Sequence, residues 1–216
     1  MNVYAVSGAA NKSRNTAEML KSALEGALSV PGATGELVNL YDLSFRGCVG
    51  CHSCKLLDKD KFAKCAMRDD LSPVLEKAKE ADVLLLGSPI YFSNVTGEMR
   101  SFLERLFFPG LTYNKDRGTT YAKRPKVGWV FTMNAPGEFY NELYSSLAGM
   151  SGRIIGETEY AIAFNTQQFD DYSQYAATSF DEEYVKKRHE EQFPLDCKAA
   201  YDMGRRLAGG ESEDEQ

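Results

Sequence analysis

Apolar and polar residues alternate along the chain with two periods, one typical of buried strands and one typical of amphipathic helices. Short apolar runs in five segments predict strands, at residues 2–9, 36–40, 81–95, 126–137 and 153–164. In the third segment, residues 83–86 form an unbroken apolar run. A run of this kind indicates a central strand with both faces covered by helices.

Apolar residues elsewhere recur at i, i+3, i+4 and i+7, the spacing of one helix face. The first and last predicted helices cover residues 15–28 and 181–207. Between them, one helix begins near residue 72, one near residue 96, and one covers about residues 140–147. Ser72 and Pro73 predict the N-cap and first turn of the second helix. Pro194 predicts a kink or a fresh start in the last one.

Five strands alternating with helices predict right-handed βαβ crossovers, and therefore an α/β fold with a mostly parallel sheet. The sequence contains no internal repeat and no linker segment. We therefore expect one domain over residues 1–207. The acidic residues 208–216 have a composition typical of a disordered tail.

Charge and composition narrow the classes of function. The 216-residue chain has a formal net charge of −6, and four acidic residues lie in its last six positions. This balance argues against nucleic-acid binding as the main task. No window reaches the roughly 18 apolar residues that a membrane span needs, and the first residues lack signal-peptide features. We expect a cytoplasmic protein whose thiols stay reduced.

Four of the five cysteines lie in one segment, as Cys48, Cys51 and Cys54 at successive x2 spacing and Cys65 ten residues further on. A C-x2-C-x2-C run can supply three ligands of a [4Fe–4S] cluster, with the fourth arriving from further away. Structural zinc is a second interpretation, although zinc knuckles usually combine two separated C-x2-C hairpins. Free thiols near the active site or at a subunit contact are the third.

Polar loops follow the predicted strands, and in an open parallel sheet such loops form the ligand site. Residues 7–20 bring Ser13, Asn15 and Thr16 to the start of a helix. Free N–H groups there favour a phosphate, although the same residue types also cap helices without any ligand. The loop contains neither a dinucleotide fingerprint nor a Walker motif.

The turn after the third strand combines Pro89, Tyr91 and Phe92 with small polar residues. Aromatic surface beside backbone hydrogen-bonding groups suits a flat heterocycle. Residues 132–139 are small and polar enough to close the other side of the same site.

The stretches "GSPIYFSNVTGEMRSFLER", "SGAANKSRNTAEML" and "CVGCHSC…KCAMRDDLSPVLEKAKEADVLLLGSPIYF" resemble the NADPH-dependent FMN reductase and iron–sulfur flavoprotein branch of the flavodoxin-like superfamily. The likeness covers most of residues 1–150. It implies a flavodoxin-like three-layer sandwich, a five-stranded parallel sheet of order 2-1-3-4-5, and bound FMN. It also implies a homodimer or homotetramer.

The resemblance also implies site residues. The FMN phosphate would lie on Ser13, Arg14, Asn15 and Thr16. The isoalloxazine would lie against Pro89, Ile90, Tyr91, Phe92, Ser93 and Asn94, with Thr132, Asn134 and Gly137 on the far side. One departure concerns Gly8, which is followed by Ala9, Ala10 and Asn11 instead of the Ser-Pro-Arg common in the family. Lys12 or Arg14 would then supply the cation.

We therefore expect an FMN-dependent NAD(P)H oxidoreductase that passes hydride from nicotinamide to flavin N5 and on to a quinone, a flavin or another acceptor. The acceptor would be a small molecule or a redox protein, and no catalytic side chain is required. One alternative is an electron carrier with a [4Fe–4S] cluster on Cys48, Cys51, Cys54 and Cys65. Another is a non-enzymatic thiol or metal sensor.

Overall fold

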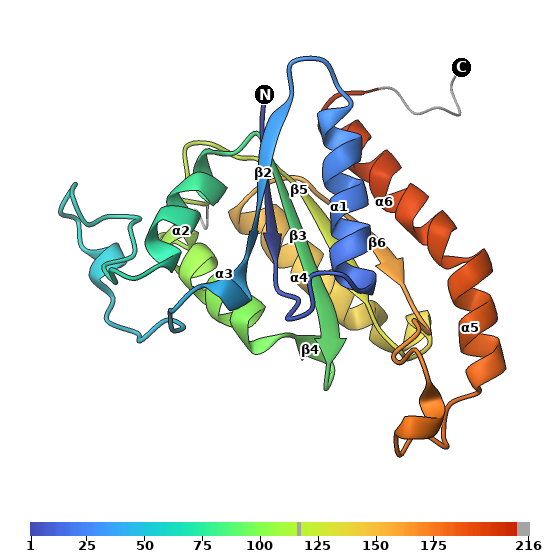
Figure 1. Cartoon of the computed structure of the whole chain (residues 1–216). Helices are drawn as coiled ribbons and strands as arrows, with labels where there is room; N and C mark the ends of the chain where they lie inside the picture. The colour runs from blue at the N-terminus through green and yellow to red at the C-terminus, as the bar shows by residue number, and fades with distance from the viewer. Residues whose placement is uncertain (116–117, 211–216) are drawn as a thin grey trace.

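Five parallel strands in the order β2-β1-β3-β5-β6 form the middle layer of the protein (Figure 1). These strands are β1 Asn2–Ser7, β2 Thr34–Asn39, β3 Val83–Tyr91, β5 Lys126–Thr132 and β6 Thr158–Ala163. Counted along the chain without the short β4, their order is 2-1-3-4-5, so the predicted flavodoxin-like α/β fold is confirmed. The computed structural model describes residues 1–115 and 118–210, and residues 211–216 of the predicted acidic tail lie outside them.

Helices cover both faces of the sheet (Figure 1). They are α1 Asn15–Leu28, α2 Leu71–Glu80, α3 Gly97–Gly110, α4 Asn141–Ile154, α5 Glu182–Glu191 and α6 Phe193–Leu207. Short 3-10 helices occupy Leu40–Asp42, Ser53–Lys55, Gly137–Tyr140 and Tyr172–Gln174. One buried apolar cluster joins the sheet to α2, α3 and α4, and a second joins it to α1 and α6. Residues 83–86 are buried on both faces, as their apolar run predicts.

The backbones of α1 and α6 approach each other closely. A Cβ added to Gly204 would lie 1.8 Å from the carbonyl oxygen of Ala23, and one added to Gly26 would lie 1.9 Å from that of Tyr201. Glycine at both positions therefore permits the helix crossing that completes this face of the sheet.

Two local features differ from the sequence prediction. The predicted N-cap at Ser72 is wrong: α2 begins at Leu71, and the Ser72 hydroxyl donates to the Met67 carbonyl at 3.0 Å from within the first turn. The short strand β4, Asn94–Val95, pairs antiparallel with the end of β3 and was not predicted. Pro194 does mark a fresh start, because it lies in the first turn of α6.

In the described part of the chain, no helix is long and apolar enough to cross a membrane.

Candidate functional site

A cleft lies at the carboxyl edge of the sheet, where the parallel strands end together. Ser7 of β1 is level with Gly87 of β3, and Pro89 of β3 is level with Thr132 of β5. The cleft has a volume of about 540 Å³, within the range of small-molecule and cofactor sites. Its lining comes from residues 9–11, 14–16, 89–91, 132–134, 166–171 and 174–175.

The N-terminus of α1 faces this cleft without a side-chain cap. Arg14 precedes the helix in extended conformation, and its side chain accepts no capping hydrogen bond from the first N–H groups. Asn11 Oδ1 instead accepts from the Ser13 N–H at 2.9 Å, which fixes the shape of the loop. Thr16 is buried, and its hydroxyl lies 2.6 Å from that of Thr132, so the helix is joined to the end of β5. An uncapped helix N-terminus of this kind suits a phosphate.

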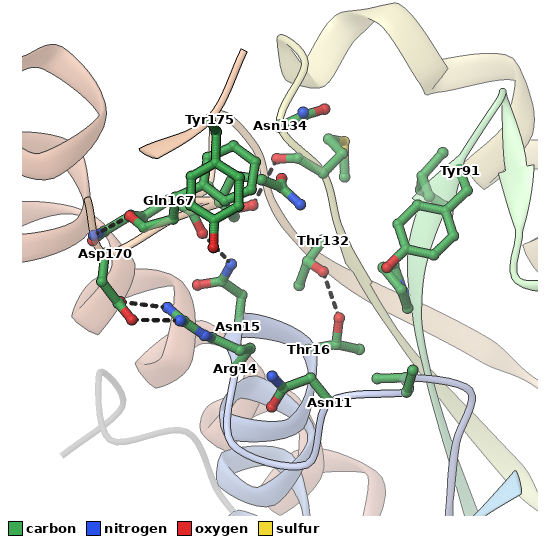
Figure 2. A pocket seen from close by; sticks show the side chains of 18 of the residues that line it. Asn11, Arg14, Asn15, Thr16, Tyr91, Thr132, Asn134, Gln167, Asp170 and Tyr175 are labelled. Carbon is green, nitrogen blue, oxygen red and sulfur yellow. Dashed lines mark hydrogen bonds and ion pairs between the residues drawn. The ribbon is translucent and has the colours of Figure 1, made fainter. Parts of the chain in front are cut away.

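Both basic residues proposed for the phosphate are paired with carboxylates. Arg14 donates from Nη1 and Nη2 to Asp170 at 2.7 and 2.6 Å (Figure 2), which raises the pKa of Arg14 and lowers that of Asp170. Lys12 Nζ lies 2.6 Å from Asp42 Oδ1. A phosphate at α1 would therefore compete with Asp170 for the Arg14 guanidinium.

A tight turn between β3 and β4 forms one wall of the cleft. Tyr91 lines the cleft and lies opposite Tyr175 and Gln167 (Figure 2). Phe92 and Ser93 have positive φ values of 48° and 62°. Two positive φ values at the centre of a two-residue hairpin loop are typical of a type I′ turn. Phe92 is fully exposed, so its ring is available to a bound molecule.

The predicted site residues do not all line the cleft. Arg14, Asn15, Thr16, Pro89, Ile90, Tyr91, Thr132 and Asn134 do, whereas Phe92, Ser93 and Asn94 lie on the turn beside it. Ser13 instead lines an adjoining polar hollow that also contains Glu18 and His189. Gly137 is buried, and a Cβ there would lie 2.9 Å from the Phe164 ring. Its role is therefore packing within this structure.

The loop after β6 supplies a wall that sequence reasoning missed. Asn15 donates from Nδ2 to the Gln167 carbonyl at 2.9 Å, which fastens this loop to α1 (Figure 2). Phe169 and Tyr175 stack with ring centroids 3.9 Å apart, above a small apolar cluster around Tyr172. The signal in the sequence was the polar and aromatic stretch "FNTQQFDDYSQY" directly after a predicted strand, at the position where ligand loops occur.

The cysteine segment forms a second, separate site. Cys48, Cys51, Cys54 and Cys65 all line one cavity of about 20 Å³, together with His52 and Arg105. No residue lines both this cavity and the cleft. Cys54 is the buried member of the four, and burial raises the pKa of its thiol.

Arg105 of α3 brings a buried cation to the cysteine cavity. Its side chain is 0% exposed, and Nη1 donates to Asp69 Oδ2 at 2.6 Å and to the Arg46 carbonyl at 3.2 Å. Among the described residues, its Nε and Nη2 have no hydrogen-bond acceptor in good geometry. Burial lowers the pKa of Arg105, but Asp69 and the neighbouring Cys65 raise it above the ordinary value.

Comparison with known families identifies the chain. Residues 1–167 match the family model described as NADPH-dependent FMN reductase. The chain belongs to the NADPH-dependent FMN reductase family. An iron–sulfur flavoprotein of Methanocaldococcus jannaschii is 34% identical over 105 residues, which are 49% of this chain and 51% of the relative. The chain therefore matches only about half the length of that curated relative.

Solved structures share the fold of this FMN reductase family member. The NAD(P)H:quinone oxidoreductase from Methanothermobacter marburgensis superimposes with a TM-score of 0.66 at 19% identity, covering 96% of each chain. An FMN-dependent NADH-azoreductase from Bacillus anthracis in complex with FMN gives a TM-score of 0.65 at 13% identity, covering 96% of this chain and 99% of the other. At such identities the likeness shows the flavodoxin-like fold alone.

The cleft fits the cofactor of the FMN reductase family. The uncapped N-terminus of α1, joined to the end of β5 through Thr16 and Thr132, lies on one side of the cleft, and the aromatic Tyr91 at the end of β3 lines it on the other. The helix N-terminus would suit the phosphate of FMN, and the aromatic wall with its polar neighbours would suit the flat heterocycle.

The cysteine cavity brings thiol groups together but, in this structure, does not fit a metal–thiolate centre. Four thiols and the buried guanidinium of Arg105 surround it. Its volume of about 20 Å³ holds about one water molecule. Within residues 1–115 and 118–210, no group of three or more His, Cys, Asp or Glu side chains is arranged to hold a metal ion.

Proposed function

We propose that the chain is an FMN-dependent NAD(P)H oxidoreductase that reduces a small-molecule acceptor such as a quinone or a flavin. The observation that carries this proposal is the cleft at the carboxyl edge, with an uncapped α1 N-terminus at one end and Tyr91 at the other. The family match over residues 1–167 and the relatives named above support it.

The residues of the chain would bind and orient the cofactor. Asn15 and Thr16, in the first turn of α1, would present N–H groups to the phosphate. Arg14 would supply positive charge once the phosphate replaces Asp170 as the partner of its guanidinium. Tyr91 and the adjacent backbone from Pro89 would support one side of the ring system. FMN, when bound, supplies the hydride and electron chemistry. The partly open wall at Tyr91, which is 49% exposed, leaves room for nicotinamide and acceptor to approach in turn.

Replacement of the aromatic wall tests this proposal. We expect Tyr91→Ala to raise the Kd for FMN and lower kcat/KM for NAD(P)H oxidation, each about tenfold, since tenfold corresponds to 1.4 kcal/mol of lost contact. Tyr113→Ala is the matched control, because Tyr113 is 70% exposed and does not line the cleft. Equal FMN binding and activity in both variants would place the flavin elsewhere.

A second candidate function is electron transfer through an iron–sulfur centre on Cys48, Cys51, Cys54 and Cys65. The convergence of all four thiols on one cavity favours it, as does the similarity to an iron–sulfur flavoprotein. Iron and acid-labile sulfide in stoichiometric amounts after anaerobic purification are the expected result. Their absence, with FMN still bound, would leave the reductase proposal standing and remove the carrier.

A further inference from the structure

An acidic side chain lies at the N-terminus of α1, beside the expected position of the phosphate. Asp170 accepts from Arg14 Nη1 at 2.7 Å and from Nη2 at 2.6 Å (Figure 2). A guanidinium fork binds a carboxylate and a phosphate through the same pair of parallel N–H groups. A negative charge is also favourable beside a helix N-terminus. The Asp170 carboxylate therefore uses the edge of Arg14 that a phosphate would use.

The loop that carries Asp170 is held in place on both sides of this residue. Before it, Asn15 Nδ2 donates to the Gln167 carbonyl at 2.9 Å. After it, Tyr172 is buried in a small apolar cluster. The side chain of Asp170, in contrast, is 78% exposed. The backbone thus presents the carboxylate to Arg14, and the carboxylate can turn away at small cost, because exposed ion pairs contribute little stability.

A polar hollow beside the cleft gives the carboxylate a second place. It has a volume of about 360 Å³, and its lining includes Arg14, Asp170, Glu18 and His189. The pKa of Asp170 is lowered by the hydrogen bond and charge of Arg14, and further by the charge of His189. Asp170 therefore remains near a second basic group when it leaves Arg14.

A phosphate has more partners at this position than the carboxylate does. It would combine the Arg14 guanidinium with the N–H groups at the start of α1. Asp170 offers one ion pair in which both side chains are exposed. The phosphate should therefore displace the carboxylate, although with a lower affinity than an unopposed Arg14 would give.

We propose that Asp170 is a specificity-determining residue of the cleft, whose carboxylate occupies Arg14 until the phosphate of a flavin displaces it. This inference rests on the proposed function and deepens it, because it predicts which flavins the residue distinguishes. FMN must displace Asp170, whereas riboflavin has no phosphate and leaves the ion pair intact. Asp170 lies outside residues 1–167, so the match to the family model assigns it no role.

Flavin binding by the 216-residue chain tests this inference. The Kd values for FMN and for riboflavin would be measured by fluorescence titration for the wild type, Asp170→Asn, Arg14→Gln and the double variant. Glu25→Gln is the matched control, because it removes one negative charge at an exposed position of α1 that lines neither the cleft nor the hollow. Circular dichroism would establish that each variant is folded.

We expect Asp170→Asn to lower the Kd for FMN about fivefold, which is about 1 kcal/mol at 1.4 kcal/mol per tenfold, and to leave the Kd for riboflavin unchanged. Glu25→Gln should change neither Kd. Arg14→Gln should raise the Kd for FMN, and in its background Asp170→Asn should have an effect of less than about twofold, because both side chains act through one ion pair. Added salt should reduce the difference between Asp170→Asn and the wild type, since exposed charges are screened.

Two results would overturn the inference and leave the reductase proposal standing. One is an Asp170→Asn chain that binds FMN with unchanged or lower affinity. The other is an equal change in affinity for FMN and riboflavin, which would give Asp170 a role in the shape of the loop and none at the phosphate. A wild-type chain that binds neither flavin would instead overturn the proposed function, and this inference with it.

Discussion

At the scale of single residues, Phe92 and Ser93 adopt a backbone conformation that L-residues avoid. Both have positive φ in the turn that follows Tyr91. A non-glycine residue in this region costs of order 1 kcal/mol or more, and such strain gathers at functional sites. Asn-Gly would form the same turn with less strain. The fully exposed Phe92 ring therefore gives a reason for retaining the strained turn.

The double variant Phe92→Asn with Ser93→Gly should therefore be more stable and bind flavin less well. We expect a gain of about 1–2 kcal/mol in the free energy of unfolding, or roughly 2–8 °C in Tm, from relief of the turn. We expect a several-fold higher Kd for FMN from loss of the ring. Thermal melts and fluorescence titration measure the two effects. Phe139→Asn, at an exposed position without positive φ, should give no stabilisation.

The Arg105–Asp69 pair is the second residue-scale feature with a measurable consequence. Burial raises the pKa of Asp69, but the hydrogen bond and charge of Arg105 lower it to a net value below the ordinary one. The unfolded chain thus binds this proton at higher pH than the folded chain does. The pair stabilises the fold above the unfolded pKa near 4, and this contribution is lost as pH falls through the folded pKa.

Asp69→Asn should destabilise the protein at neutral pH by about 3 kcal/mol, because it leaves the buried Arg105 charge uncompensated. Chemical denaturation from pH 7 down to pH 3 should show the difference from wild type shrinking at the acid end. Glu182→Gln removes an exposed ion pair with Lys186 and should leave the free energy of unfolding nearly unchanged at every pH. A difference that grew toward acid pH would contradict the assignment.

At the scale of secondary structure, the close crossing of α1 and α6 depends on glycine. Gly204→Ala would place a methyl group 1.8 Å from the Ala23 carbonyl oxygen, so the helices must separate. We expect a loss of about 3 kcal/mol or more, equivalent to roughly 6–12 °C in Tm. Gly149→Ala on the exposed face of α4 meets nothing within 4 Å. It should be neutral or stabilising by up to about 1 kcal/mol. An equal Tm for both variants would contradict the close approach of the α1 and α6 backbones at Gly204.

The elements themselves were largely predictable, because helix and strand periods reflect burial on one or two faces. The predicted helix 15–28 matches α1 residue for residue, and Pro194 correctly predicted the break before α6. The β4 hairpin was missed because Phe92 and Ser93 are poor residues for its turn, so sequence gave no turn signal. Ser72 was misassigned because capping depends on a loop conformation that spacing does not encode.

At the scale of the whole molecule, parallel strand order brings loops distant in sequence to one edge. The predicted order 2-1-3-4-5 is confirmed, and it places the ends of β1, β3 and β5 around one cleft. The ion pair between Arg14 and Asp170 and the wall at residues 166–175 could not be predicted. They depend on how the loop after β6 folds back over α1, a long-range contact without a local pattern. Likewise, spacing alone did not show that Arg105 reaches the cysteines.

The central claim is that this cleft holds a redox-active flavin. Absorbance of the purified chain, reconstituted with FMN and freed of excess, tests it most directly. We predict about one FMN per chain, with flavin bands near roughly 370 and 450 nm that bleach anaerobically on addition of NADH or NADPH and return with a quinone. A folded, colourless chain that takes up no FMN, or bound flavin that neither nucleotide bleaches, would contradict the account.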